Sequence, residues 1–495
     1  MPIFLLLALF VAFGFDTSDG RRSMALPELA AKLGTTAVCV LVIGLTARSA
    51  ALLIQRGVRR SRSGDAAVRR LHAAAVRGFE LASLIAFSWT IHGAADWPGV
   101  VRGGLRLRGT LVLDDALIVT PYILMQLAIW WGLYPAERAL RLGGDWDDPH
   151  IGLTRYLWRQ ARRALGLVLP AALVFSVGQG AVRRLFPTFW NEPWAQPVTI
   201  AALGVVVLML SPAFVRLAWP TTPLPPGPLR TRLERLCRRH GFRCTDILVW
   251  DTGHVLVNAG VTGAVPWFRY VLLTDGLIES LDEHQIAAVF GHEIGHIAHR
   301  HLLYFGFFFL ASLGLMALFE RAVTDALAWL PPYLDGLLAG DGLLSSVETV
   351  AALALVGLYF LLVFGFLSRR LERQADVFGC RAVSCGGAAC PPHVDPYAVD
   401  VATSTARQAL CPVGIRIFVN ALRNVAELNG LETDRRSWRH GSIGRRIAFL
   451  ETLVDRPDAE RRFQAGTARL RLGVALVLIA CFVAAVSSGS FDGRR

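Results

Sequence analysis

Long apolar runs, separated by short arginine-rich stretches, dominate the chain. Continuous runs of this kind, as opposed to amphipathic stripes, are typical of helices that cross a bilayer, which needs about 20 residues per helix. The first run is the weakest candidate for a membrane span. No basic residue precedes it and no small-x-small cleavage site follows it, so we expect a retained span and not a cleaved signal peptide. The expected spans are 3–15, 35–54, 79–95, 112–134, 164–180, 198–218, 302–320, 347–367 and 470–488.

The pattern of long apolar runs ends after the sixth run, and this change predicts the domain organisation. Residues 1–218 form an amino-terminal membrane region of about six spans. The proline-rich stretch 219–228 is expected to be a stiff linker, because proline cannot continue a helix. Residues 229–450 have mixed polarity and form a second domain, which a two-span hairpin at 302–367 interrupts and the span 470–488 follows. Within it we expect an amphipathic helix at 229–240 and short strands at 246–250, 254–258 and 269–273.

Composition and charge support a membrane protein and indicate its orientation. The chain has 495 residues, of which 54% are hydrophobic and 18% charged, and its net charge of +13 comes almost entirely from arginine. A basic chain can bind nucleic acid, but these arginines follow the bias of cytoplasmic membrane loops, so no nucleic-acid partner is expected. Residues 55–79 hold seven arginines against one acid, whereas 323–345 hold three acids and no base. Counting spans from these two loops places 219–301 and 368–469 in the cytoplasm, although the outer loops 96–111 and 181–197 also carry some arginine.

The segment Gly291-His292-Glu293-Ile294-Gly295-His296 carries the strongest chemical signal. Asp282 with Gln285 predicts the start of a helix before it. Side chains four apart lie on one helix face, so His292 and His296 can bind one zinc ion, while Glu293 is placed to take a proton from the zinc's water. The alternative is a helix end that is simply rich in histidine, since His284, His299 and His301 lie nearby.

A second segment, 368–376 (SRRLERQAD), supplies the missing third ligand. Glu372 and Asp376 are again four apart, and we expect Glu372 to bind zinc and Asp376 to orient a ligand histidine. On its own such a pair is more often a solvated face. Two expected spans separate His296 from Glu372, and two crossings return the chain to the same side of the membrane, so both halves of the site can meet.

The two motifs together resemble the integral-membrane zinc metallopeptidase family of the type I CAAX prenyl proteases and the bacterial heat-shock protease HtpX, over about residues 229–450. The resemblance implies a gluzincin-like zinc peptidase domain in a mainly α, polytopic membrane protein with a small antiparallel β element. It implies one Zn²⁺ per chain on His292, His296 and Glu372, with Glu293 as general base and Asp376 in support.

Looser similarities extend the expected site. Asn258, in the segment 257–260, resembles an asparagine that lies beside bound substrate on an edge strand. His440, with Arg446 after it, resembles a late histidine that stabilises the tetrahedral intermediate, although glycine follows it here where the family has proline. The alternatives are a turn asparagine and a surface histidine.

Other regions depart from the family. Residues 380–412 are a probable insertion, in which Cys380, Cys385, Cys390 and His393 offer a second metal site but no CxxC pair.

The sequence therefore predicts a zinc endopeptidase that cuts peptides or membrane proteins within a lipid bilayer, with its site on the cytoplasmic face of a bacterial inner membrane. Because lysine is almost absent and no organellar signal is found, membrane-protein quality control is favoured over CAAX-type processing. A non-catalytic scaffold or transporter is the rival from another class, and Asp114 and Asp115 are the notable polar residues at a span edge.

Overall fold

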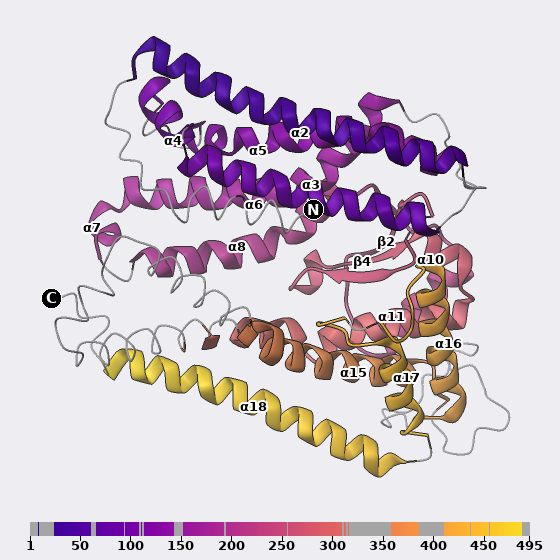
Figure 1. Cartoon of the computed structure of the whole chain (residues 1–495). Coiled ribbons are helices and arrows are strands. Elements are labelled where there is room, and N and C mark those ends of the chain that lie inside the picture. The colour runs from indigo at the N-terminus through magenta and orange to yellow at the C-terminus, as the bar shows by residue number, and fades with distance from the viewer. Residues whose placement is uncertain are drawn as a thin grey trace, which may run out of the picture. The chain divides into compact units, whose positions relative to one another are not determined.

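The computed structural model describes residues 24–60, 66–142, 152–312, 358–385 and 410–487, apart from a few positions inside these ranges, together with Ala8 and Leu315. The described chain is mainly helical and divides into two compact units, Met1–Thr221 and Thr222–Arg495. Figure 1 shows both units, and each is described here by itself. The expected span 3–15 and most of the expected hairpin 302–367 lie outside the described residues.

The amino-terminal unit consists of long apolar helices, as the hydrophobic runs predict. Among its described residues, four helices are long and apolar enough to cross a membrane. Helix α6 makes a fifth candidate span, although it is bent by 43° between Gly166 and Val168. Pro170 lies four residues after Gly166 and lacks the N–H that would bond to the carbonyl of Gly166, which explains the bend. The helices of this unit are α2 (Leu26–Arg60), α3 (Ala66–His92), α4 (Trp97–Gly99), η1 (Val100–Gly104), α5 (Leu113–Leu142), α6 (Leu153–Leu185), α7 (Pro187–Trp190) and α8 (Ala195–Ala218).

The second unit contains a four-stranded sheet in the order β1-β2-β4-β3. Its strands are β1 (Thr221–Pro223), β2 (Asp246–Trp250), β3 (Ala259–Thr262) and β4 (Tyr270–Thr274). Strand β2 pairs with β4 in parallel and β3 pairs with β4 antiparallel, so the sheet is mixed and not purely antiparallel as expected. The long connection from β2 to β4 lets the chain cross over and leave β3 at the edge.

The strand expected at 254–258 lies instead at Ala259–Thr262. Gly253 and His254 have φ angles of 67° and 56°, a left-handed conformation that an extended strand excludes. A strand can form only after this turn. The part of the expected linker at Thr221–Pro223 also forms a strand, β1.

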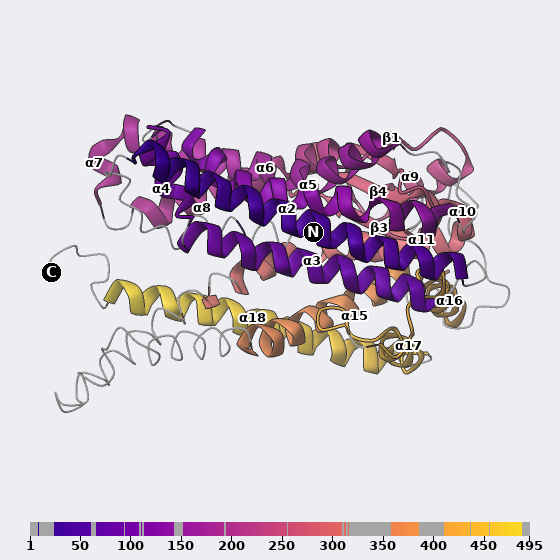
Figure 2. The same cartoon turned by 45° about the horizontal axis from the view of Figure 1, so that its top comes forward.

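The helices of this unit include the two that carry the motifs, α11 with the histidine motif and α15 with the segment 368–376. These two helices lie side by side in Figures 1 and 2, and α18 runs along α15. Helix α18 begins well before the expected span 470–488, and its apolar candidate span is Asp458–Cys481. The helices are α9 (Pro228–Arg239), η2 (Pro266–Phe268), α10 (Asp275–Ser280), α11 (Glu283–Ala298), η3 (Phe360–Phe364), α15 (Gly365–Ala382), α16 (Pro412–Leu428), α17 (Ile443–Glu451) and α18 (Pro457–Ser487).

Helices α11 and α15 approach each other closely because α11 carries glycine where they touch. A Cβ atom on Gly291 would lie 2.5 Å from the Cβ of Ala382. A Cβ on Gly295 would lie 2.9 Å from the Cβ of Phe378 and 3.1 Å from the Cα of Ala375. Both glycines sit inside the histidine motif, so the motif supplies ligands on one face and close packing on another.

Candidate active site

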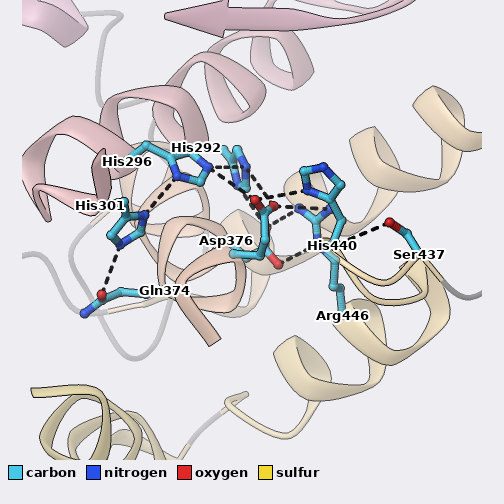
Figure 3. Close-up of polar contacts among 9 residues, drawn as sticks. His292, His296, His301, Gln374, Asp376, Ser437, His440 and Arg446 are labelled. Atoms are coloured by element: carbon cyan, nitrogen blue, oxygen red, sulfur yellow. Dashed lines mark hydrogen bonds and ion pairs between the residues drawn. The ribbon is translucent and has the colours of Figure 1, made fainter. Parts of the chain in front are cut away.

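Helix α11 presents the two motif histidines from one face, as the spacing predicts. Asp282 caps the helix, its carboxylate accepting hydrogen bonds from the backbone N–H groups of His284 and Gln285. The Nε2 atoms of His292 and His296 lie 3.2 Å apart (Figure 3). Opposite them on α15, the carboxylate of Glu372 lies 3.7 Å from Nε2 of His292 and 3.8 Å from Nε2 of His296.

This arrangement suits a single metal ion. Two ligands at about 2.0 Å from one tetrahedral ion lie about 3.3 Å apart, close to the separation of the two imidazole nitrogens. Among the described residues, the group of three acidic, histidine or cysteine side chains that could hold a metal is His292, His296 and Glu372, whose ligand atoms all lie within 4.8 Å of one another. Two imidazoles and a carboxylate are the ligands of catalytic zinc sites that keep a position open.

The other ring nitrogen of His292 faces Asp376, which is fully buried. Nδ1 of His292 lies 2.9 Å from Oδ1 of Asp376. A proton on Nδ1, held by this carboxylate, leaves the lone pair of Nε2 directed at the metal position. Asp376 therefore lies at ion-pair distance from the histidine that we expected it to orient.

Arg446 holds Asp376 in turn. Its Nε and Nη2 donate to the two carboxylate oxygens at 2.8 and 2.5 Å, and its Nη1 lies 3.9 Å from Glu372. Burial raises the pKa of Asp376, but Arg446 and the bond to His292 outweigh burial, so the pKa lies below its usual value. The pKa of Glu372 is also lowered, because His440, His292 and Arg446 outweigh its burial.

His296 has a support that the sequence did not reveal. Its Nδ1 lies 2.9 Å from Nδ1 of His301, whose Nε2 lies 3.2 Å from Oε1 of Gln374 (Figure 3). Gln374 donates to Gln464 on α18 at 2.5 Å, and Arg471 on α18 donates to Gln374. If His296 donates from Nδ1 to His301, and His301 donates from Nε2 to Gln374, then Nε2 of His296 is free for a metal.

His301 was visible in the sequence only as one of several nearby histidines. The single signal available was its position just after the helix that carries the ligands. Its contact with Gln374, 73 residues away in the chain, required the tertiary structure.

Glu293 follows the first ligand and lines a cleft of about 930 Å³ with His292, His296 and Glu372. Burial is the main cause that raises the pKa of Glu293 to about 7, with the negative charge of Glu372 adding to it and His292 opposing it. A bound dication would lower this pKa again. A carboxylate beside the metal position, neither a ligand nor ion-paired in the described structure, is free to exchange a proton.

The segment before β3 forms one wall of the cleft. Asn258 is exposed there, and its backbone N–H donates to Oγ1 of Thr274 at 2.9 Å. The side-chain amide of Asn429 pairs with Val257 as a neighbouring strand would, accepting from its N–H at 3.2 Å and donating to its carbonyl at 2.9 Å. Asn429, which sequence reasoning missed, thus fixes the segment that leads to Asn258.

His440 lies at the same cleft, on the loop before α17, and its side chain is 49% exposed. Its Nδ1 is 3.0 Å from Oε1 of Glu372. The structure therefore brings Asn258, His440 and Arg446 to the cleft that contains the three ligand side chains.

The proposed cysteine site is not supported in the same way, because Cys380 is fully buried in α15, while Cys390 and His393 lie outside the described residues.

Residues 223–395 match the family model described as Peptidase family M48. The chain is 26% identical over 189 residues to a protease HtpX homolog of Aeropyrum pernix, covering 36% of this chain and 56% of that protein. It is 33% identical over 110 residues to CAAX prenyl protease 1 of Saccharomyces cerevisiae, covering 21% of this chain and 23% of that protein. The match thus spans only about half the length of the first of these relatives.

A crystal structure of S. mikatae Ste24p aligns with 85% of this chain and 99% of its own, at 16% identity and a TM-score of 0.45. The resemblance expected from the two motifs is confirmed by the family match, the sequence relatives and the meeting of the motif residues in space.

Proposed function

We propose that the chain is a membrane-embedded, zinc-dependent endopeptidase, because residues 223–395 match the model of peptidase family M48. The observation that carries this proposal is the meeting of His292, His296 and Glu372 with their Nε2 and carboxylate atoms directed at one point. Helices long enough to cross a membrane support the membrane setting: the described residues contain five, or six with the bent α6.

The polar residues beside the proposed zinc position have distinct roles in the peptide hydrolysis that we propose. A zinc ion held by His292, His296 and Glu372 would polarise the scissile carbonyl and lower the pKa of the attacking water. Glu293 takes the proton from that water and passes it to the leaving amine. Asp376 and Arg446 keep His292 in the tautomer that presents Nε2.

The exposed wall at Asn258 receives the substrate. An extended peptide can pair with an edge segment through backbone hydrogen bonds, and β3 lies at the edge of the sheet. Thr274 and Asn429 hold the preceding backbone in place, so the wall is formed before substrate binds. His440, half-exposed beside Glu372, donates to the oxyanion that develops on the attacked carbonyl.

The biological role we propose is quality control of membrane proteins at the cytoplasmic face of a bacterial inner membrane. The composition of two segments supports this orientation, because 55–79 is rich in arginine and 323–345 carries three acids and no base. The near absence of lysine supports a bacterial chain, in which prenylated substrates are not expected. CAAX-type processing is the alternative, since a CAAX prenyl protease is among the relatives.

Casein cleavage by the detergent-purified full chain tests the activity. We expect the wild type to cut casein, a chelator to abolish cutting, added zinc to restore it, and Glu293→Gln to be inactive while still binding zinc. Equal cleavage by wild type and Glu293→Gln would end the proposal. A prenylated CAAX peptide and a misassembled membrane protein, offered in parallel, separate the two roles by which substrate is cut.

A further inference from the structure

A second cavity, of about 370 Å³, adjoins the catalytic cleft. Four arginines line it, Arg369 and Arg373 from α15 and Arg445 and Arg446 from α17, together with the loop 437–442. We call it the arginine pocket. None of its lining residues is acidic, and it shares Ser437, His440, Gly441 and Arg446 with the cleft, so a molecule in the cleft can extend directly into it.

Only one of these four arginines is neutralised by a carboxylate in the described structure. Arg446 is bound to Asp376. Arg369 donates to the backbone carbonyl of Trp438 at 2.7 Å, and the guanidinium of Arg373 lies over the ring of Phe449, 5.2 Å from its centroid. Arg445 is exposed at the first turn of α17, and no ion pair to it is found among the described residues.

The packing of Arg369 and Arg373 keeps positive charge in the pocket. An arginine held by a carbonyl or a ring retains free N–H donors and its full charge, and several such groups attract an anion. Burial and the neighbouring cations, chiefly Arg370, lower the pKa of Arg373, although the charge of Asp376 opposes them. An anionic ligand would relieve this unfavourable environment.

We propose that the arginine pocket is a substrate subsite that binds a carboxylate of the peptide at a fixed distance from the scissile bond. The carboxylate belongs to an aspartate or glutamate side chain or to the free carboxyl terminus, which present the same planar pair of oxygens to guanidinium groups. A peptide is favoured because His440 and Arg446 line both cavities, so one ligand can occupy the cleft and the pocket together. The subsite rests on the proposed peptidase function.

Matched peptides test the subsite. Casein fragments produced by the zinc-loaded full chain define a cleaved sequence. A neutral version of this peptide is then compared with versions that carry one glutamate, or its glutamine counterpart, at each successive position. A further pair differs only in a free carboxyl terminus against a carboxamide. The readout is the ratio of kcat/KM for the acidic peptide to that for its neutral partner.

We expect this ratio to be about tenfold at one position, as charge-assisted hydrogen bonds to arginine give, and near one elsewhere. Arg445→Gln and Arg373→Gln should each reduce the ratio toward one, whereas Arg416→Gln, an exposed arginine of α16 outside both cavities, should leave it unchanged. Arg373→Lys serves as the second variant if loss of the contact with Phe449 impairs folding.

Three results would overturn the subsite while leaving the peptidase intact. The first is cleavage of all peptides with no acidic preference at any position. The second is a preference that persists in both arginine variants. The third is a phospholipid that copurifies with the wild type and is lost in both variants, with no acidic preference in any of them. This third result would assign the pocket to a lipid phosphate. Failure of the wild type to cut any peptide would instead refute the proposed function.

Discussion

The buried pair of Asp376 and Arg446 gives the sharpest test of how the site is held together. Asp376 is completely buried and contacts both Arg446 and His292. Asp376→Asn keeps the size of the side chain and an oxygen for Nδ1 of His292, but it removes the negative charge. Arg446→Met removes the positive charge and keeps most of the packing.

The two variants should differ in a way that follows from these contacts. Removing one partner of a buried pair leaves the other unpaired and costs about 3–5 kcal/mol of folding free energy. Asp376→Asn should in addition weaken zinc binding about 10-fold to 100-fold, or about 1.4–2.7 kcal/mol, because the support of His292 is weakened. The double variant leaves no unpaired charge at this pair, so its folding cost should be smaller than the sum of the two single costs by at least about 1 kcal/mol.

Denaturant unfolding of the zinc-free, detergent-solubilised full chain measures the folding costs, and competition with a chelator measures zinc affinity. An exposed ion pair, Arg423 with Glu451, provides the control, because neutralising either should cost less than about 1 kcal/mol. Additive folding costs at Asp376 and Arg446 would refute the conclusion that the two charges stabilise each other. Unchanged zinc affinity in Asp376→Asn would refute its role in orienting His292.

Three further predictions follow from the described contacts. His301→Phe keeps a ring but cannot accept a hydrogen bond from Nδ1 of His296, so it should weaken zinc binding about 10-fold or more in the chelator assay. An unchanged zinc affinity would mean that the contact between the two histidines is incidental. Gly295→Ala should lower the melting temperature and reduce the free energy of unfolding by about 1–3 kcal/mol, because its Cβ would press on Phe378 and the backbone of α15. A stability equal to that of the wild type would show that α11 and α15 can move apart without cost. Burial lowers the pKa of His240 from its usual value of about 6.5 to about 4, so folding favours the neutral imidazole. The contribution of His240 to stability is therefore lost as the pH falls from about 6.5 toward 4. The melting temperature of His240→Gln should therefore fall less between pH 7 and pH 5 than that of the wild type, and parallel curves would contradict this assignment.

Some of the site could be predicted from the sequence because helix geometry determines it locally. Residues four apart share a face of any α-helix, so the paired positions of His292 with His296, and of Glu372 with Asp376, follow from spacing alone. The capping carboxylate of Asp282 is equally local. The apolar runs predicted long helices, although the bounds of the helices differ from those of the runs because polar turns extend many of them.

Contacts between distant residues depended on the tertiary structure. The sheet is mixed because its strand order is set by crossovers and by the turn at His254, which no local periodicity encodes. Asn429 replaces a missing strand neighbour of Val257 from 172 residues away.

The sequence by itself determined which side chains are the candidate zinc ligands, since ligand type and helical spacing are properties of short segments. Only the tertiary structure decided how the chemistry is supported: His301 and Gln374 behind His296, and unneutralised arginines beside the cleft. The physical reason is that a side chain's partner, unlike its position on a helix face, depends on how segments far apart in the chain pack together.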